Sequence, residues 1–127
     1  MARIALFQNK NKGSVNENLN AGISAIKEAA ENGADLILFP EVQLTEFFPQ
    51  YPGQDVSGYA CELDGEIIQA FQAACRENHI MAVPNVYLRE GEIMVSRRWY
   101  MSRRRSISTS RTTIRHPMTD SMCSIRT

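Results

Sequence analysis

The 127-residue sequence is poor in cysteine and has no long hydrophobic run. Cys61, Cys75 and Cys123 form no Cys-x-x-Cys pair, which argues against a disulfide scaffold or zinc site and is typical of the reducing cytoplasm. A transmembrane helix needs about 20 apolar residues in succession, so we expect no membrane association. The opening residues, with Arg3 among them, predict no secretory signal. No metal-ligand cluster, phosphate loop or dinucleotide fingerprint occurs, so we expect neither metal nor cofactor.

Lysine and acidic residues are scarce in the last part of the chain. No lysine follows Lys27, and Asp120 is the single acid in residues 93–127, which hold eight arginines, seven serines and five threonines. Residues 1–92 instead carry thirteen acids against six bases. The formal net charge of zero therefore hides two parts of opposite sign, with a boundary near Gly91. We expect an ordered part at 1–92 and a disordered or frame-shifted tail at 93–127.

Strands and helices alternate through the acidic part. Ser14 and Glu17 form a capping-box pattern ahead of an apolar stripe with helical spacing, and Gly33 is placed to end that helix. Asp64 is the predicted cap of a second helix. Strands are expected at 2–8, 35–39 and 80–88, with a long loop at 42–62. The order βαβαβ predicts an α/β fold with helices packed on a sheet.

A carboxylate follows the second predicted strand directly. That strand is apolar on both faces, Pro40 ends it, and Glu41 comes next. Carboxyl ends of strands are where α/β proteins build their sites, and a glutamate held against apolar neighbours has a raised pKa suited to a general base. The structural alternative is a solvated loop acid or a helix cap. Phe47 and Phe48 either line the mouth of a pocket or pack the loop down.

These residues resemble the opening of the nitrilase superfamily of carbon–nitrogen hydrolases. The resemblance covers residues 2–92 and rests on Arg3-Ile-Ala-Leu-Phe-Gln, on Asn18, on the run from Gly33 to Pro49 that contains Phe-Pro-Glu, and on Ile80-Met-Ala-Val-Pro-Asn-Val-Tyr-Leu-Arg-Glu. It implies a partial αββα sandwich, the N-terminal portion of a fold that commonly forms homo-oligomers. It also implies a small-molecule amide, carbamoyl or nitrile substrate. More specifically, we expect a linear amide or an N-carbamoyl compound as the substrate. This expectation corresponds to the N-carbamoyl amidohydrolase branch of the family.

The resemblance further implies a Glu-Lys-Cys mechanism, of which this chain retains one member. The family's glutamate, a general base, corresponds to Glu41. Its oxyanion-stabilising lysine and nucleophilic cysteine lie beyond the resemblance and have no convincing counterpart here. Cys75 falls on a helix face and is interpreted as a buried small hydrophobe, and Cys61 as incidental. We therefore expect no hydrolase activity from the chain as written.

The tail supports a further hypothesis, that of a shifted reading frame. In this frame, each new codon combines the last base of one codon with the first two bases of the next. The genetic code then requires Gly across Met94–Val95 and Val across Trp99–Tyr100. The set allowed over Met94 to Met101 includes Gly-Val-Ser-Lys-Met-Val-His, which resembles the surroundings of the family's lysine. Two readings remain beside it: a disordered extension, and a non-catalytic α/β module whose Arg/Ser-rich tail binds nucleic acid.

Overall fold

The computed structural model describes the backbone of residues 1–90, 93–101 and 106–112, and the side chains of residues 1–89. One mixed sheet has the strand order β1-β2-β3-β5-β4, and β6 pairs with β5. The strands are β1 (Ile4–Leu6), β2 (Leu36–Leu38), β3 (Met81–Val83), β4 (Asn85–Glu90), β5 (Ile93–Met101) and β6 (Ser106–Thr112). The helices are α1 (Val15–Glu31) and α2 (Glu66–Glu77), with short 3-10 turns at Phe48–Gln50 and Ser57–Tyr59.

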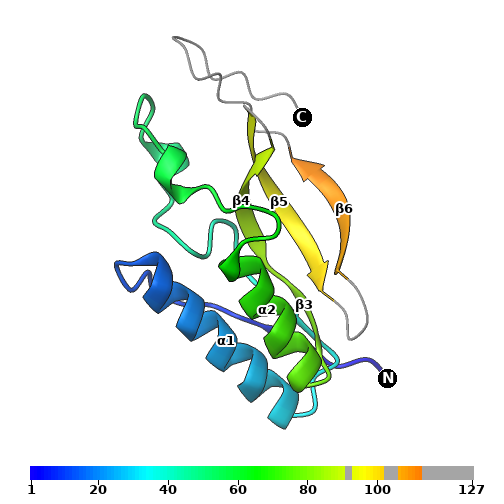
Figure 1. Ribbon diagram of the computed structural model, residues 1–127. Helices are drawn as coiled ribbons and strands as arrows, with labels where there is room; N and C mark the ends of the chain where they lie inside the picture. The colour runs from blue at the N-terminus through cyan, green and yellow to red at the C-terminus, as the bar shows by residue number, and fades with distance from the viewer. Residues whose placement is uncertain (91–92, 102–105, 113–127) are drawn as a thin grey trace.

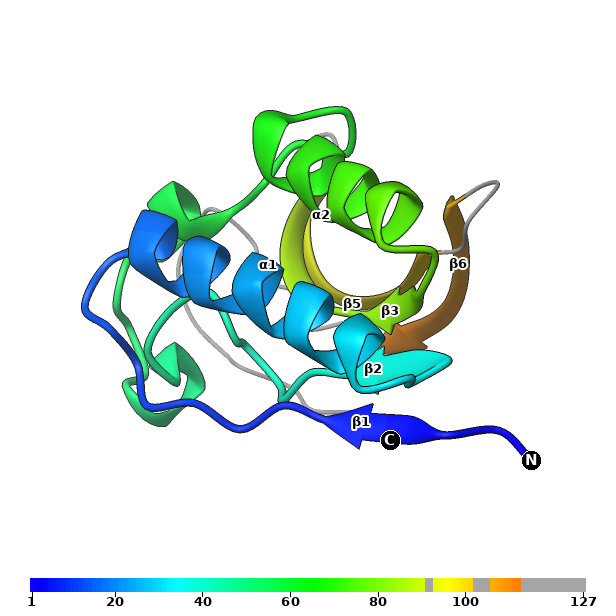
Figure 2. The ribbon, with the colours of Figure 1, turned by 90° about the horizontal axis from the view of Figure 1, so that it is seen from below.

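The first three strands are parallel and joined through the two helices, which confirms the βαβαβ order. β1 pairs with β2, and β2 pairs with β3, in continuous register. Both helices lie on the same face of this sheet, as Figures 1 and 2 show. β1 therefore forms one edge of the sheet, and the carboxyl ends of β2 and β3 lie side by side.

Helix α1 begins and ends at the predicted residues. The Ser14 hydroxyl oxygen accepts a hydrogen bond from the Glu17 backbone N–H at 3.2 Å, and the hydroxyl donates to the Glu17 carboxylate at 3.0 Å. These bonds satisfy a backbone donor that the helix cannot satisfy itself. Gly33 follows the helix at φ 75°, a left-handed conformation that glycine adopts without strain.

Helix α2 differs from the prediction at its first residue. The N-cap is Gly65 rather than Asp64, and no side chain bonds to the free backbone N–H groups there. The Asp64 backbone carbonyl instead accepts a hydrogen bond from the Gln69 side chain at 2.7 Å. The buried residues of the helix are Ile68, Phe71, Ala74 and Cys75.

The core lies between the helices and the parallel strands and contains a row of aromatic rings. Phe7 and Phe39 have ring centroids 5.1 Å apart, and Phe39 and Phe71 have theirs 5.8 Å apart, in tilted and edge-on orientations that favour attraction. A Cβ atom at Gly22 would lie 3.3 Å from the Phe71 ring. Glycine at this position therefore lets α1 approach the aromatic rings closely.

The opposite face of the parallel strands is apolar and incompletely covered. Side chains alternate across a strand, so the residues beside the core-facing Ala5, Ile37 and Ala82 point away from the helices. The strand register groups them in two rows, Ile4–Leu36–Met81 and Leu6–Leu38–Val83. Leu6 is 76% exposed and Ile4 is 55% exposed, which is unusual for neighbouring aliphatic side chains on a sheet.

The third predicted strand is divided at Pro84, where a bulge or an edge was expected. β3 is parallel to β2, whereas β4 is antiparallel to β5. A proline lacks the N–H that a continuous ladder would use at this position. β3 and β4 both pair with β5, which pairs in turn with β6.

The structure differs from the prediction in the tail. Residues 93–101 and 106–112 were expected to be irregular, but they form β5 and β6, and the β4–β5 hairpin crosses the compositional boundary near Gly91. Serine and arginine carry little strand signal and dominate the tail as a whole, which conceals the strand formers at the two ends of β5. Pairing with the neighbouring strand accounts for β6. Cys123 and the rest of residues 113–127 lie outside the described residues.

Candidate functional site

Glu41 lies in a turn beyond the carboxyl end of β2. Phe39 continues the strand pairing, since its N–H donates to the Val83 carbonyl at 3.3 Å, and Pro40 then ends it. The Glu41 side chain is exposed. Among the described residues, no hydrogen bond or ion pair involves its carboxylate. The chain thus places Glu41 at the strand end, as predicted, but the described residues do not enclose it with apolar groups.

The residue after Glu41 has an unusual backbone conformation. Val42 has φ 53°, a left-handed value that a β-branched residue rarely adopts. Its N–H donates to the Asn85 side-chain oxygen at 2.9 Å. Asn85 is the first residue of β4, is 5% exposed, and lies two residues beyond the end of β3. Two neighbouring strand ends therefore meet through this hydrogen bond.

A second buried asparagine contacts the same turn from the helical layer. Asn18 on α1 is 4% exposed, and its side-chain nitrogen donates to the Leu44 carbonyl at 2.9 Å and to the Asn11 side-chain oxygen at 2.8 Å. Its oxygen accepts from the Lys12 N–H at 2.9 Å. Asn18 thereby joins the loop before α1 to the turn that carries Glu41. No local motif predicts either asparagine contact, although both residues lie in the segments that carry the family resemblance.

Gln43, two residues after Glu41, has a buried amide without a partner among the described residues. Both its nitrogen and its oxygen are inaccessible to solvent and make no hydrogen bond there, and the Tyr87 hydroxyl is in the same state. An unsatisfied buried polar group costs on the order of 1–3 kcal/mol. The Glu41 turn therefore contains polar groups that the described part of the chain leaves unpaired.

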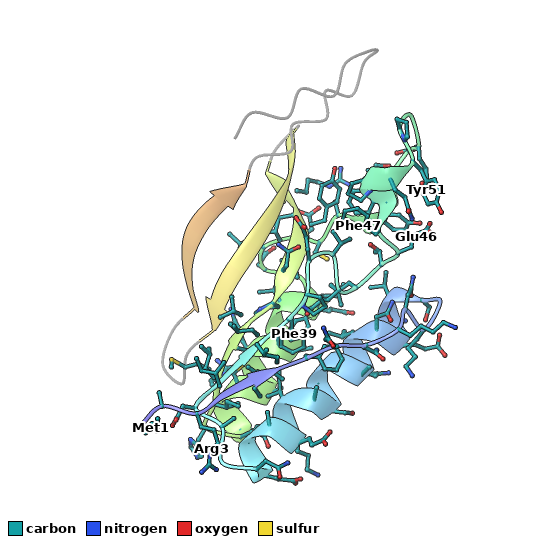
Figure 3. The ribbon with its side chains drawn as sticks, turned by 180° about the vertical axis from the view of Figure 1, so that it is seen from behind. Met1, Arg3, Phe39, Glu46, Phe47 and Tyr51 are labelled. Atoms are coloured by element: carbon teal, nitrogen blue, oxygen red, sulfur yellow. The ribbon has the colours of Figure 1, made fainter. Side chains whose placement is uncertain are left out.

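The two phenylalanines named as pocket candidates have different surroundings. Phe48 is 3% exposed and packs against Tyr87 and Tyr59, with ring centroids at 5.1 and 5.7 Å. Phe47 is half exposed. Figure 3 shows Phe47, Glu46 and Tyr51 grouped at one end of the molecule, far from Met1 and Arg3. Phe48 thus packs the loop against β4, whereas Phe47 lies at the surface.

Neither described cysteine has the environment of a nucleophile. Burial raises the pKa of the Cys61 thiol to about 11, with a contribution from the charge of Glu62. Burial raises the pKa of Cys75 to about 12. The thiolate is the reactive form, so both residues are held in their unreactive state. Cys61 has a structural role, because its N–H donates to the Tyr87 carbonyl at 2.7 Å and ties the loop to β4.

A cavity of about 290 Å³ lies away from Glu41, between the edge strand β1 and helix α1. Arg3, Ala5, Phe7, Ala29 and Asn32 are among its lining residues. In the part of the chain that the structure describes, no group of three or more His, Cys, Asp or Glu side chains could hold a metal ion. The described helices include none that is long and apolar enough to cross a membrane.

Comparison with known proteins identifies the class of protein that this fold and turn define. The family model of carbon–nitrogen hydrolases matches residues 3–116. The chain belongs to the carbon–nitrogen hydrolase family. The match extends beyond residue 92, where the resemblance in the sequence was expected to end. No significant match to a curated protein was found.

Solved structures show the same fold. A carbon–nitrogen hydrolase from Helicobacter pylori G27 has a TM-score of 0.70 at 10% identity, over 87% of this chain and 40% of its own length. An amidase from Nesterenkonia sp. has a TM-score of 0.68 at 23% identity, over 91% and 44%. A Glu-to-Gln variant of the Nesterenkonia sp. AN1 amidase, with acrylamide added to its active-site cysteine, has a TM-score of 0.68 at 20% identity, over 94% and 51%. The chain therefore spans about half the length of these structures or less. They share its partial αββα architecture and do not single out the N-carbamoyl branch.

Proposed function

We propose that this chain is the N-terminal half of an amide-hydrolysing carbon–nitrogen hydrolase and that Glu41 is its general base. The observation that carries the proposal is the position of Glu41, on a fixed turn at the carboxyl end of β2 in a chain of this family. In the complete enzyme, Glu41 would take the proton of a cysteine thiol as the sulfur attacks the amide carbon. It would then pass that proton to the amide nitrogen, which leaves as ammonia while the thioester forms. The same carboxylate would then activate the water that releases the acid.

One feature supports the view that the described chain is part of a larger fold. The apolar face formed by Ile4, Leu6 and Met81 is exposed. Such a face is costly in a finished protein, and a second sheet packed on it would cover it. We propose that the intact protein supplies that sheet, together with the lysine and cysteine, and forms a homo-oligomer.

The hypothesis of a shifted reading frame rests on the sequence of the tail, which is rich in Arg, Ser and Thr and has no lysine. We propose that the tail derives from a sequence that, in the alternative frame, carries the Ser-Lys-Met-Val-His surroundings of the catalytic lysine.

Substrate class and cellular location are proposed on the same basis. The Nesterenkonia structure with acrylamide favours small linear amides, and the alternative-frame string favours N-carbamoyl compounds among them. Two free, buried cysteines favour the cytoplasm. The nucleic-acid alternative is less well supported, because part of the arginine-rich segment pairs into the sheet as β5 and β6. Salt-sensitive binding of RNA by residues 93–127 would favour that alternative.

Comparing the chain as written with a frame-restored version tests the proposal. We expect the 127-residue chain to release no ammonia from acrylamide or N-carbamoyl substrates, because members of an interdependent catalytic set cannot act alone. The frame-restored protein should release ammonia, and Glu41→Gln should lower kcat by roughly a thousandfold or more. Glu46→Gln, in the same loop, is the matched control and should retain activity. Glu41-dependent turnover by the chain as written would refute its inactivity, and a fully active frame-restored Glu41→Gln protein would refute the role of Glu41.

A further inference from the structure

The turn that carries Glu41 is held in a conformation that its own sequence disfavours. Val42 has φ 53°, and a Cβ-branched residue meets steric conflict there. His79 also has a positive φ, at 54°, but it follows the C-cap of α2, where a left-handed residue is a common way to end a helix. Val42 follows a strand, so no helix end accounts for its conformation. Such strain persists where surrounding contacts enforce it, and it gathers at functional sites.

Two buried side chains supply those contacts from opposite directions. Asn85 on β4 accepts the Val42 N–H at 2.9 Å, and Asn18 on α1 donates to the Leu44 carbonyl at 2.9 Å. Asn18 and Asn85 are the polar residues that the described part of the chain buries most completely. Burying an amide is costly unless its hydrogen bonds are made, and both amides direct a hydrogen bond to the backbone of this one short turn.

We propose that Asn85 and Asn18 are positioning residues that clamp the turn from Val42 to Leu44 and thereby fix the direction of Glu41. The carboxylate is exposed and has no partner among the described residues, so its orientation comes from the backbone beneath it. A general base must lie within hydrogen-bond reach of its proton donor, and a small displacement of the turn would move the Glu41 carboxylate out of that reach. The functional meaning of the clamp rests on the proposed role of Glu41, but the clamp itself is measurable without turnover.

Hydrogen exchange and proteolysis in the full 127-residue chain test the clamp. The first readout is the exchange rate of the Val42 amide, resolved by fragmentation in a mass spectrometer. The second is cleavage of the Glu41–Val42 bond by a glutamate-specific protease, relative to the Glu62–Leu63 bond in the same molecule. Asn85→Leu removes the acceptor and should raise both rates about tenfold. Asn85→Asp keeps a side-chain oxygen at that position and should lower both rates below those of Asn85→Leu, which a general loss of stability would not allow.

The matched control is Asn78→Leu, at the C-terminus of α2, where the asparagine side chain donates to the Ala74 carbonyl at 2.8 Å. It should leave the exchange of Val42 and the relative cleavage after Glu41 unchanged. If Asn85→Leu does not fold, wild-type exchange at Val42 decides the matter, and we expect it to be at least about tenfold slower than that of an unprotected amide. An unprotected Val42 amide, or an Asn85→Asp chain that matches Asn85→Leu, would overturn the clamp. If the clamp proves absent, ammonia release still tests Glu41-dependent hydrolysis. If hydrolysis is not observed, hydrogen exchange and proteolysis still test the clamp.

Discussion

At the scale of single residues, the cysteines show how burial decides chemistry. Cys61 and Cys75 are of the same residue type as the family's nucleophile, yet burial raises the pKa of both thiols. A catalytic cysteine needs an electropositive, partly exposed environment that lowers the pKa. The sequence suggested this outcome for Cys75 through its place on an apolar helix face, and the structure confirms that the side chain is fully buried.

The raised pKa of Cys75 predicts a loss of stability at alkaline pH. Its value is raised from 9.0 to about 12 by burial, so between those values the folded chain keeps a proton that the unfolded chain loses. The contribution to folding is full below pH 9 and declines as the pH rises toward 12. Cys75→Ala removes this dependence, and its stability difference from wild type should shrink between pH 8 and pH 11 in urea titrations. A difference that stays constant over this range would contradict the prediction.

The site was predictable from the sequence only in part, for a reason that also lies at the residue scale. Glu41 follows an apolar strand, and that local pattern places it at a strand end. Asn85 lies 43 positions from Val42 in the sequence, and no periodicity or cap motif connects them. The left-handed φ of Val42 is equally invisible, because the residue type argues against it. Tertiary contacts determine both features.

At the scale of elements, local signals predicted helix α1 well and α2 less well. The capping box and Gly33 define both ends of α1, because hydrogen bonds at helix ends come from nearby residues. At α2 the same reasoning chose Asp64, but the helix begins one residue later and Gly65 takes the cap. β6 was missed because it is rich in Ser and Thr and has no apolar alternation. β5 was missed because the composition of the whole tail conceals the strand formers Ile, Val, Trp and Tyr at its two ends.

The cap of α1 gives a prediction with a defined magnitude. Ser14→Ala removes the acceptor of the Glu17 N–H and should lower the free energy of unfolding by about 1 kcal/mol. Ser24→Ala, at an exposed position inside the same helix, is the matched control and should be neutral or slightly stabilising. Urea unfolding of the three proteins checks both values. Equal effects from the two substitutions would show that the cap contributes nothing of its own.

At the scale of the whole molecule, the described chain has one covered sheet face and one exposed apolar face. Both helices pack on the first face, and the core that they form is well filled with aromatic and aliphatic side chains. The other face combines exposed aliphatic residues with an unpaired edge at β1. Unpaired edges and large apolar patches promote association. The chain covers 40% and 44% of two solved relatives, which agrees with the proposal that the intact protein supplies a second sheet to cover this face.

This imbalance predicts that the 127-residue chain associates through the exposed face. Burial of apolar surface contributes about 25 cal/mol per Å², so pairing two such faces is favourable. We expect sedimentation velocity to show species larger than the 14.3 kDa monomer, increasing with concentration. Ile4→Thr with Leu6→Thr keeps strand propensity while making the face polar, and should shift the distribution toward monomer. Leu63→Thr removes an equally exposed aliphatic side chain from the loop before α2 and should have no such effect. A wild-type chain that stays monomeric and unfolds in one cooperative transition would show instead that the exposed face is tolerated, and the argument for a missing second sheet would lose its main physical support.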